Sequence, residues 1–507
     1  MSKEKLLLIV MDGFGIAPKG KGNCIANAKT PNYNSLSKNY SFTKLLAHGG
    51  NVGLPGKSIG NSEVGHLHMG AGRVVWQPFE LINRKIKDKS FFKNNAFLKA
   101  IENCKKNNST LHLLGMCSDE GVHASINHLF ALIDLCKKEK FNDFVVHCIL
   151  DGRDVPEKSA PKYIKQLEAK LKKIGSGRIA SIAGRYYSMD RDKNWDRTKE
   201  SYKMLTLGKG FSAKTALKAV QDAYERGDKT DYYVRPAVIG EPVVVKDNDS
   251  VIFFNFRTDR PRQLTHAFLD KTFSGFERQV VPKELFVTFT RYDDILKCDV
   301  AFEYETISHN VAEVISNAGL KQLRLAETEK YAHVTYFFNS QHNEPYHGEE
   351  RIMIPSSKVP SYDLAPEMSA AGIRDVAVKV IPEKKFDFIL LNFANCDLVG
   401  HSGVMPAVIK AVETVDSCLG DVVKSALANN YSVFITADHG NAEEMLYKNG
   451  EAKPSHTTNK VPFILVSNSK SLAKKKLRSG QLLDIAPTIL KFFGLKKPKE
   501  MTGKPLY

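Results

Sequence analysis

The chain has 507 residues, which is too long for one ordinary hydrophobic core and predicts two or more domains. With 42% hydrophobic and 25% charged residues, the composition is that of a soluble globular protein. No apolar run approaches the roughly 20 residues of a membrane helix, so we expect no membrane partner. The first apolar run leads directly into Asp12, which indicates a strand rather than a signal peptide and favours the cytoplasm.

The net charge of +17 would fit a nucleic-acid-binding protein. However, the lysines are spread along the chain, and no aromatic RNA-binding motif accompanies them. We therefore interpret the charge as a solvated lysine-rich surface, compatible with a small anionic substrate and without a nucleic-acid partner. The eight cysteines are scattered and form no C-x-x-C pair, which predicts reduced, mostly buried thiols.

Eight apolar runs predict strands, and ionisable side chains follow each of them. In chain order these are 5–11 before Asp12, 111–117 before Asp119 and His123, 144–150 before Asp151, Arg153 and Asp154, 178–184 before Arg185 and Arg191, 251–256 before Arg257, Asp259 and Arg260, 285–290 before Arg291 and Asp293, 386–393 before Asp397 and His401, and 431–437 before Asp438 and His439. The runs are continuous rather than alternating, as in parallel sheets covered on both faces. Helical patterns lie between them, for example at 125–140 and 407–427. The sequence thus predicts two α/β domains with largely parallel sheets.

The charged strand ends sort by residue type along the chain. The middle, residues 150–262, supplies arginines, whereas residues 12–62 and 397–456 supply Asp, His and one serine. We infer a discontinuous domain, 1–76 with 311–507, and an inserted domain, 77–310, that face one cleft. In such sheets ligands gather at the carboxyl ends of the strands, where these side chains lie.

Three aspartates and three histidines of the outer segments form a candidate metal set: Asp12, Asp397, His401, Asp438, His439 and His456. Each one alone has an ordinary structural explanation, such as a turn or a helix cap. Together they offer mixed oxygen and nitrogen ligands, which suit Mn, Zn or Fe rather than calcium. Six ligands are too many for a single open catalytic ion and suit two metals about 3.5–4 Å apart.

Ser62 lies in the glycine-rich stretch GNSEVGH, which does not match the G-x-S-x-G motif of a serine served by a distant histidine. By itself the stretch fits a plain glycine-rich loop. A divalent cation, however, lowers the pKa of a bound hydroxyl, so a metal-bound Ser62 needs no neighbouring base. The charges of three carboxylates and one alkoxide also balance those of two divalent cations. A phosphoserine intermediate is the prediction.

Arginines after the middle strands predict an anion-binding set, because their planar guanidinium groups match phosphate and carboxylate oxygens. The set is Arg153, Arg185, Arg191, Arg257 and Arg260. Asp154 is positioned in sequence to exchange a proton with a substrate hydroxyl, and His123 could do similar work or bind phosphate. Any one of these arginines could equally form a surface salt bridge of little energetic weight.

The motifs MDGFG, GNSEVGH, DGRD, FNFRTDR, ANCDLVGH, TADHGN and PSHTT resemble, in order and spacing, those of cofactor-independent phosphoglycerate mutases. The resemblance runs the whole length and extends in the metal core to the alkaline phosphatase superfamily. It implies an alkaline-phosphatase-like core with an inserted phosphotransferase domain, and two Mn(II) ions. One metal would take Asp397, His401 and His456, and the other Asp12, Ser62, Asp438 and His439. The implied substrate residues are His123, Arg153, Asp154, Arg185, Arg191, Arg257, Arg260 and Lys330.

The function expected on this basis is interconversion of 3-phosphoglycerate and 2-phosphoglycerate in glycolysis, by a monomer that needs no 2,3-bisphosphoglycerate. Ser62 would take the phosphoryl group, Lys330 would neutralise it and Asp154 would act on the glycerate hydroxyl, with domain closure excluding water. The alternatives are a metal-dependent phosphomonoesterase or a phosphopentomutase of the same superfamily. A nucleic-acid-binding protein is a remote alternative.

Overall fold

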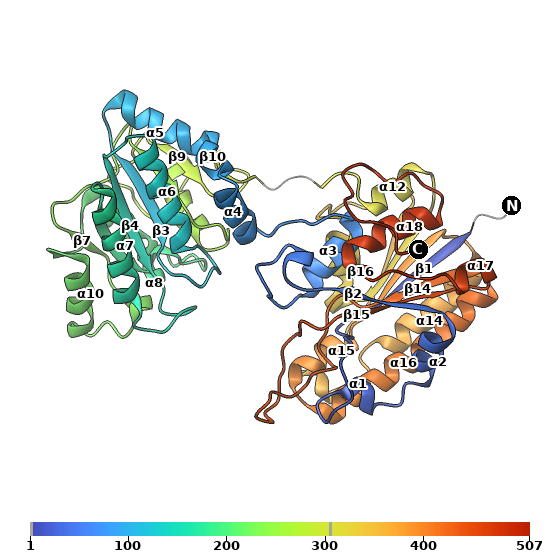
Figure 1. Cartoon of the computed structure of the whole chain (residues 1–507). Coiled ribbons are helices and arrows are strands. Elements are labelled where there is room, and N and C mark those ends of the chain that lie inside the picture. The colour runs from blue at the N-terminus through green and yellow to red at the C-terminus, as the bar shows by residue number, and fades with distance from the viewer. Residues whose placement is uncertain (1–3, 304–306) are drawn as a thin grey trace. The chain divides into compact units, whose positions relative to one another are not determined.

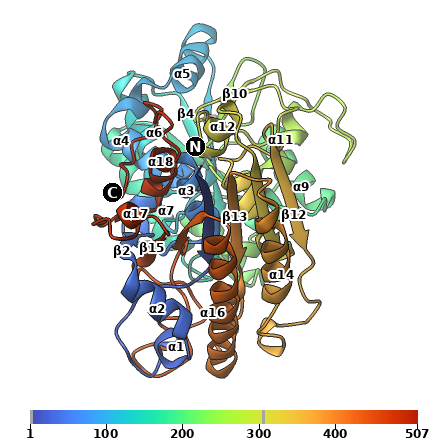
Figure 2. The same ribbon diagram turned by 90° about the vertical axis from the view of Figure 1, so that its right-hand side faces the viewer.

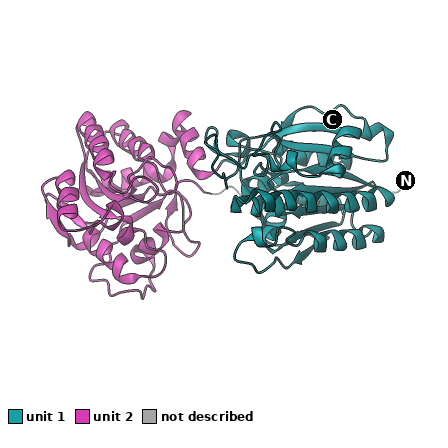
Figure 3. Cartoon of the chain, turned by 90° about the horizontal axis from the view of Figure 1, so that it is seen from below, with its two compact units in different colours: residues 1–76, 306–507 teal, residues 77–305 magenta. Residues whose placement is uncertain are grey.

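The computed structural model describes residues 4–303 and 307–507. The chain forms two compact units, coloured separately in Figure 3. Unit 1 is Met1–Trp76 with Thr306–Tyr507, and unit 2 is Gln77–Glu305. Each unit holds a sheet of eight described strands, most of them parallel. The predicted α/β class with largely parallel sheets is confirmed.

The unit 1 sheet has the order β12-β11-β13-β1-β14-β15-β2-β16. Every described neighbouring pair is parallel except the two that involve β15. The bounds are β1 Lys5–Met11, β2 Ser41–Leu46, β11 Gln322–Glu327, β12 Glu349–Ile354, β13 Phe388–Phe393, β14 Tyr431–Thr436, β15 Val461–Val466 and β16 Gly480–Gln481.

Helices cover both faces of this sheet. On one face α14 (Ala370–Val380) and α16 (Met405–Ala428) pack side by side, as Figure 2 shows. On the other face lie α3 (Ser62–Ala71), α12 (Val311–Asn317) and α18 (Ile485–Phe492), which contact one another (Figure 1). Helix α16 begins at Met405, just before the predicted start at 407, and has Pro406 in its first turn, where a missing N–H costs no hydrogen bond.

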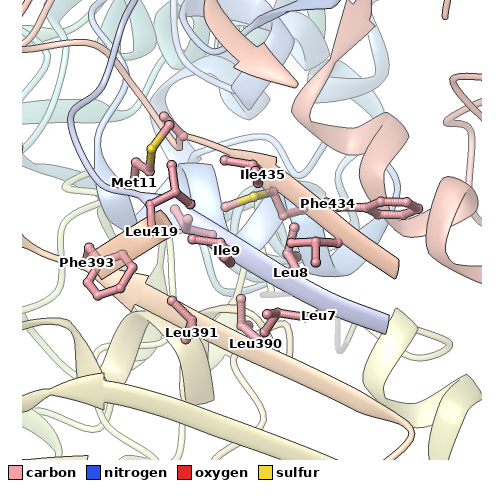
Figure 4. Packing of buried hydrophobic residues seen from close by; sticks show 14 of the residues in the cluster. Leu7, Leu8, Ile9, Met11, Leu390, Leu391, Phe393, Leu419, Phe434 and Ile435 are labelled. Atoms are coloured by element: carbon pink, nitrogen blue, oxygen red, sulfur yellow. The ribbon is translucent and has the colours of Figure 1, made fainter. Parts of the chain in front are cut away.

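Strand β1 is the centre of the unit 1 core. Leu8 lies opposite Leu390 of β13 and Phe434 of β14, and all three side chains are fully buried (Figure 4). Burying such a side chain contributes about 1.5–3 kcal/mol relative to exposure. Because β1 is covered on both faces and paired on both edges, the position of Asp12 just after it is rigidly fixed.

The unit 2 sheet has the order β10-β9-β8-β3-β4-β5-β7-β6, and the pair β5–β7 is antiparallel. Its strands are β3 Leu111–Met116, β4 Phe144–Leu150, β5 Arg178–Gly184, β6 Phe211–Ala213, β7 Ala237–Ile239, β8 Ser250–Phe253, β9 Leu285–Thr288 and β10 Asp299–Val300. Its longer helices are α4 Pro78–Lys87, α5 Asn95–Asn107, α6 Ile126–Lys138, α7 Ala160–Ile174, α9 Trp195–Leu207, α10 Ala216–Glu225 and α11 Pro261–Leu269.

All eight predicted strands are present, as β1, β3, β4, β5, β8, β9, β13 and β14. Among the described residues, no helix has the length and apolar character needed to cross a membrane. The cysteines are free thiols, seven of them buried and Cys298 half-buried, as predicted.

Candidate metal centre and arginine cluster

Four adjacent parallel strands of unit 1 deliver the charged side chains to one edge of the sheet. Strands β11, β13, β1 and β14 are neighbours in this order, so their carboxyl ends lie side by side. The residues that follow these ends are, in the same order, Lys330, Asp397, Asp12 and Asp438. Three carboxylates from distant parts of the chain therefore meet at one place.

Ser62 reaches this place as the first residue of helix α3. Asn61 caps the helix by accepting a hydrogen bond from the backbone N–H of Val64. Gly65, one turn in, allows the helix to approach closely, since a Cβ there would lie 2.8 Å from the Cβ of Asp438. The side chain of Ser62 is consequently buried.

The Ser62 Oγ contacts three ionisable groups. It lies 2.6 Å from the Nζ of Lys330, 3.0 Å from the Nε2 of His439 and 3.1 Å from Asp12 Oδ1. The same ammonium of Lys330 donates to Asp12 at 2.7 Å and to Asp397 at 2.6 Å. One buried cation thus joins two carboxylates and the serine.

These contacts set the protonation of the centre. Burial by itself would raise the pKa of Asp12, but the charge of Lys330 and a hydrogen bond with His439 outweigh it and hold this pKa far below its usual range. Burial would likewise lower the pKa of Lys330, and the charges of Asp12 and Asp397 raise it instead. Both groups are therefore charged at neutral pH.

The three predicted histidines share one arrangement. Their Nδ1 atoms face backbone carbonyls: His401 faces Pro454 at 3.0 Å, His456 faces Gly60 at 2.8 Å, and His439 faces Gly440 at 3.3 Å. Their Nε2 atoms converge on Oδ1 of Asp397, at 3.2, 2.9 and 3.8 Å respectively. An imidazole that donates from Nδ1 offers its Nε2 lone pair as a ligand, which is the pattern of metal-binding histidines.

The environment of the Asp438 carboxylate shows whether these residues fit a metal ion. Its Oδ2 is fully buried and accepts no hydrogen bond from any described residue. Burial and the neighbouring charge of Asp12 raise its pKa to about 7. The acidic neighbours Asp438 and Asp397 overcome the effect of burial on His439 and raise its pKa to about 10. The near neighbours of Asp438 Oδ2 are imidazoles, since this oxygen lies 3.5 Å from both His66 Nδ1 and His439 Nε2. A buried carboxylate oxygen that accepts no hydrogen bond, beside a converging imidazole set, fits divalent transition metals.

All seven predicted metal residues belong to this one cluster. Five of them are buried, His456 is half-buried and His401 is exposed. Their division between two ions stays a prediction. His439 Nε2 is also within 3.8 Å of Asp397, so it lies between the two predicted ligand sets.

Two residues of the centre that sequence reasoning gave no role are His66 and Asn392. The Nδ2 of Asn392 donates to Asp12 Oδ2 at 2.8 Å and lies 3.1 Å from Nε2 of His66. His66 donates from Nδ1 to the backbone oxygen of Ser62 at 2.9 Å. Both side chains are fully buried, and together they fix the orientation of Asp12 relative to Ser62. His66 lies in the motif GNSEVGH, and this motif is the sequence signal that could have identified it.

Glu443 is a third such residue. Its buried carboxylate accepts hydrogen bonds from the backbone N–H of Gly15 at 3.0 Å and of Asn441 at 2.8 Å, and from the hydroxyl of Thr457. These donors belong to the loops that carry Asp12, His439 and His456. Glu443 therefore ties the three loops that carry predicted metal ligands to one another.

The arginine cluster of unit 2 is built in the same way, because β8, β3, β4 and β5 are adjacent and parallel. Arg185, which is buried, follows β5 and donates to Asp151 at 2.7 Å and to Asp154 at 2.6 Å. Its other terminal nitrogen lies 2.9 Å from Nε2 of His123. One guanidinium thus holds the proposed acid–base aspartate and the predicted histidine.

His123 is neutral in this cluster. Burial, then the charges of Arg185 and Arg257, lower its pKa to about 3. Its Nδ1 makes no hydrogen bond with any described residue and lies 4.0 Å from Asp259 Oδ1. A buried donor without a partner among charged groups is typical of a ligand site.

Asp259 gathers two more of the predicted arginines. It binds Arg191 at 2.8 Å and Arg257 at 3.0 Å. Arg260 is buried and donates to the backbone oxygen of Met189 at 3.0 Å. Arg153 is exposed, and its backbone N–H is held by Asp151 at 3.3 Å. Asp151 and Asp259 were noted only as strand ends, yet they position the arginines.

Comparison with known proteins matches both units. Residues 82–294 match the family model described as BPG-independent PGAM N-terminus, and residues 323–456 match the model of type I phosphodiesterase / nucleotide pyrophosphatase. A 2,3-bisphosphoglycerate-independent phosphoglycerate mutase of Clostridium acetobutylicum is 51% identical over 100% of both chains. The chain belongs to this family. A phosphoglycerate mutase of the same name from Moorella thermoacetica is 48% identical over 99% of this chain and 98% of its own.

A solved structure of a phosphoglycerate mutase extends the likeness to the fold. The protein is that of Leishmania mexicana, crystallised at low cobalt concentration. It is 30% identical, aligns with a TM-score of 0.65 and covers 100% of this chain and 98% of its own. The predicted resemblance to cofactor-independent phosphoglycerate mutases is therefore confirmed.

Proposed function

We propose that this chain interconverts 3-phosphoglycerate and 2-phosphoglycerate, as an isomerase independent of 2,3-bisphosphoglycerate, through a phosphoserine at Ser62. Unit 1 would transfer the phosphoryl group, and unit 2, the inserted domain predicted at 77–310, would hold the glycerate. Family membership over the full length supports the reaction. The observation that carries the mechanism is the position of Ser62 Oγ among Lys330, His439 and Asp12.

The metal-binding role rests on the donor set of the centre. We propose two Mn²⁺ ions, one at Asp397, His401 and His456 and the other at Asp12, Ser62, Asp438 and His439. Divalent cations there would lower the pKa of a serine hydroxyl and neutralise phosphoryl oxygens. The Oδ2 of Asp438, which accepts no hydrogen bond from the described residues, and the converging Nε2 atoms support this assignment.

Ser62 is prepared as a nucleophile by groups of the chain itself. The ammonium of Lys330 donates to its Oγ, which favours the ionised form and later the charge on the phosphoryl oxygens. Ser62 also begins helix α3, whose positive end favours negative charge in this position. In the first step its Oγ bonds to phosphorus and the bond from phosphorus to the substrate oxygen breaks.

Asp154 would balance the protons. The leaving glycerate oxygen takes a proton from the Asp154 carboxyl, and after glycerate reorients, Asp154 removes a proton from its other hydroxyl. That oxygen then bonds to the phosphorus of phosphoserine, and Ser62 Oγ leaves. Arg185, held 2.6 Å from Asp154, keeps this carboxyl in place, and the remaining arginines would bind the substrate carboxylate.

Ser62→Ala tests the central step. The variant removes the nucleophile while leaving the aspartates and histidines in place, so it should bind Mn²⁺ but show no interconversion of the two phosphoglycerates. Wild type incubated with 3-phosphoglycerate should yield a phosphorylated Ser62 peptide by mass spectrometry. Retained activity in the alanine variant would exclude the serine intermediate, and release of free phosphate alone would favour a phosphomonoesterase.

The remaining parts of the proposal concern the setting of the enzyme. We propose that it works as a cytoplasmic monomer on small-molecule substrates, with no nucleic-acid partner. The absence of a basic aromatic RNA-binding motif supports the last point, since the lysines are dispersed. Light scattering would test whether the protein is a monomer, and nucleic-acid binding assays at varied salt would test whether it has a nucleic-acid partner.

A further inference from the structure

A cavity of about 610 Å³ lies within unit 2 beside the arginine cluster. It is lined from four segments: residues 191–195, residues 259–266, the loop 270–275 and Asp293. Of the proposed substrate residues, only Arg191 lines it, together with its partner Asp259. Its volume is within the range of small-molecule sites.

The acidic side chains of the cavity are already paired. Asp270 accepts from the backbone and hydroxyl of Thr272, and its other oxygen lies 3.3 Å from His266. Asp293 lies 3.2 Å from His266 and also accepts a backbone N–H. Asp259 is bound by Arg191 and Arg257. Among these carboxylate oxygens of the described residues, Asp259 Oδ1 alone accepts no hydrogen bond.

The cationic side chains are left with unused donors. Lys193 is exposed, and its ammonium makes no hydrogen bond or ion pair with any described residue. Arg262 donates from Nε to the backbone oxygen of Tyr292 at 2.8 Å, and the same Nε lies 3.7 Å from Oδ2 of Asp293. Its terminal nitrogens form no hydrogen bond within the described part of the chain. Because an ammonium offers three donors and a guanidinium five, the cavity holds a surplus of donors and favours an anion.

The backbone at Lys193 gives an independent indication. Its φ is +60°, in the left-handed region that costs a non-glycine residue about 1–2 kcal/mol. The turn is imposed by Asp190, which accepts the N–H groups of Asp192 and Asn194, and by Gln263, which accepts that of Lys193. Strain maintained in this way clusters at ligand sites.

Two aromatic side chains complete the cavity. Trp195 and Phe273 meet edge to face, with ring centroids 5.1 Å apart, and both line it. We propose that this cavity binds a small organic phosphate, a phosphate monoester that carries a planar ring. Lys193 and Arg262 hold the phosphate, and the ring packs against the aromatic pair.

Binding at this site is coupled to the substrate through Arg191. A phosphate in the cavity competes with Asp259 for the guanidinium of Arg191. Because Arg191 is also a proposed substrate residue, the bound phosphate changes how the chain binds substrate and so acts as an effector. The coupling rests on the proposed function, whereas binding itself does not. A measurement of binding that needs no catalysis therefore separates failure of one from failure of the other.

The chain has two tryptophans, Trp76 and Trp195, so Trp76→Phe leaves a single reporter inside the cavity. We expect AMP to change its fluorescence saturably, with inorganic phosphate at least about tenfold weaker and adenosine without effect. Equilibrium dialysis of labelled AMP against the wild-type protein should give the same dissociation constant as the fluorescence titration. No saturable binding, or equal binding of adenosine and AMP, overturns the proposal. Inorganic phosphate binding as tightly as AMP overturns the role of the ring.

Lys193→Gly separates loss of binding from loss of fold. Glycine relieves the strain at φ +60°, so the variant should be at least as stable as wild type, yet its affinity for AMP should fall about tenfold or more. Lys271→Gln is the matched control, because Lys271 is exposed in the same loop region but does not line the cavity. Unchanged affinity in Lys193→Gly, or an equal loss in Lys271→Gln, overturns the site.

Discussion

The Nζ of Lys330 donates a hydrogen bond of 2.6 Å to the Oγ of Ser62, although 267 residues separate them in the chain, and both side chains are buried. The same nitrogen binds Asp12 and Asp397. A buried ammonium that contacts two carboxylates and the proposed nucleophile has two proposed roles, one in the charge balance of the site and one in the chemistry at Ser62.

Lys330→Met should separate these two roles. The side chain keeps its apolar length but loses the charge, so kcat/KM should fall about 10²–10³-fold, as when one donor to a developing oxyanion is removed. In EDTA the variant should also lose about 3–5 kcal/mol of unfolding free energy, because two buried carboxylates lose the ammonium that they share. Activity assays and urea unfolding measure both effects.

Lys358→Met, at an exposed position of the same unit, is the control and should change neither quantity. If Lys330→Met unfolds like wild type in EDTA, the ammonium does not stabilise the carboxylates. Wild-type kcat/KM in this variant would contradict its catalytic role.

Metal binding should release protons from His439 and Asp438. In the metal-free chain the pKa of His439 is about 10, because Asp438 and Asp397 outweigh burial, and that of Asp438 is about 7, because of burial and Asp12. Ligands bind metal deprotonated, so near pH 8.5 about one proton should leave, from His439. Below about pH 7, metal binding should also release a second proton, from Asp438. The affinity for Mn²⁺ should therefore fall as pH falls.

Calorimetry in buffers of different ionisation enthalpy counts these protons directly. His439→Ala should release about one proton fewer near pH 8.5. A proton count that stays at zero, or an Mn²⁺ affinity that is flat from about pH 8.5 to pH 6, would show that the two groups are already deprotonated without metal.

Glu443→Gln should loosen the metal centre without touching a ligand. In the wild type one carboxylate oxygen of Glu443 accepts hydrogen bonds from the backbone N–H groups of Gly15 and Asn441. Glutamine puts an NH₂ donor in place of a carboxylate oxygen, so the three loops lose hydrogen bonds to this shared side chain. We expect Mn²⁺ affinity to fall about 10–100-fold, the usual cost of losing such a supporting contact. Manganese EPR measures free and bound metal independently of activity.

The adjacent Glu444 offers a matched control for this variant. Glu444 lies on the same loop but binds Lys453 and Asn459 at the protein surface. Glu444→Gln should therefore leave Mn²⁺ affinity within about twofold of wild type. Equal losses in the two variants would mean that the loop is sensitive to any change.

The sequence predicted the strands that place Asp12, Asp397 and Asp438, because parallel strands buried on both faces consist of continuous apolar runs. It did not predict β11, which carries Lys330 to the site. Residues 322–325 alternate polar with apolar, and the polar residues Gln322, Arg324 and Glu327 are buried against hydrogen-bond partners from elsewhere in the chain. The guanidinium of Arg324, for example, lies 5.1 Å from the ring centroid of Phe338 and 5.4 Å from that of Phe388, contacts that no local pattern can reveal.

The supporting residues were hidden for a similar reason. Glu443 follows the motif TADHGN and has the appearance of an ordinary loop glutamate. Its role depends on donors from Gly15, Asn441 and Thr457, and the distance between these groups is a property of the folded chain. Charged strand ends identify candidate sites, whereas contacts among distant loops decide how their side chains are held.

Arg185→Lys should impair the substrate side alone. The guanidinium spans Asp151, Asp154 and His123 at once, and a single ammonium cannot reproduce this fork. Displacement of Asp154 should lower kcat about 10²-fold, and KM for phosphoglycerate should rise. Because the metal residues lie in unit 1, Mn²⁺ affinity should stay unchanged. Arg197→Lys, in the same unit at the Asp190 ion pair, should retain wild-type kinetics. Weakened Mn²⁺ binding in Arg185→Lys, or wild-type kcat, would show that this arginine does not position the acid–base group.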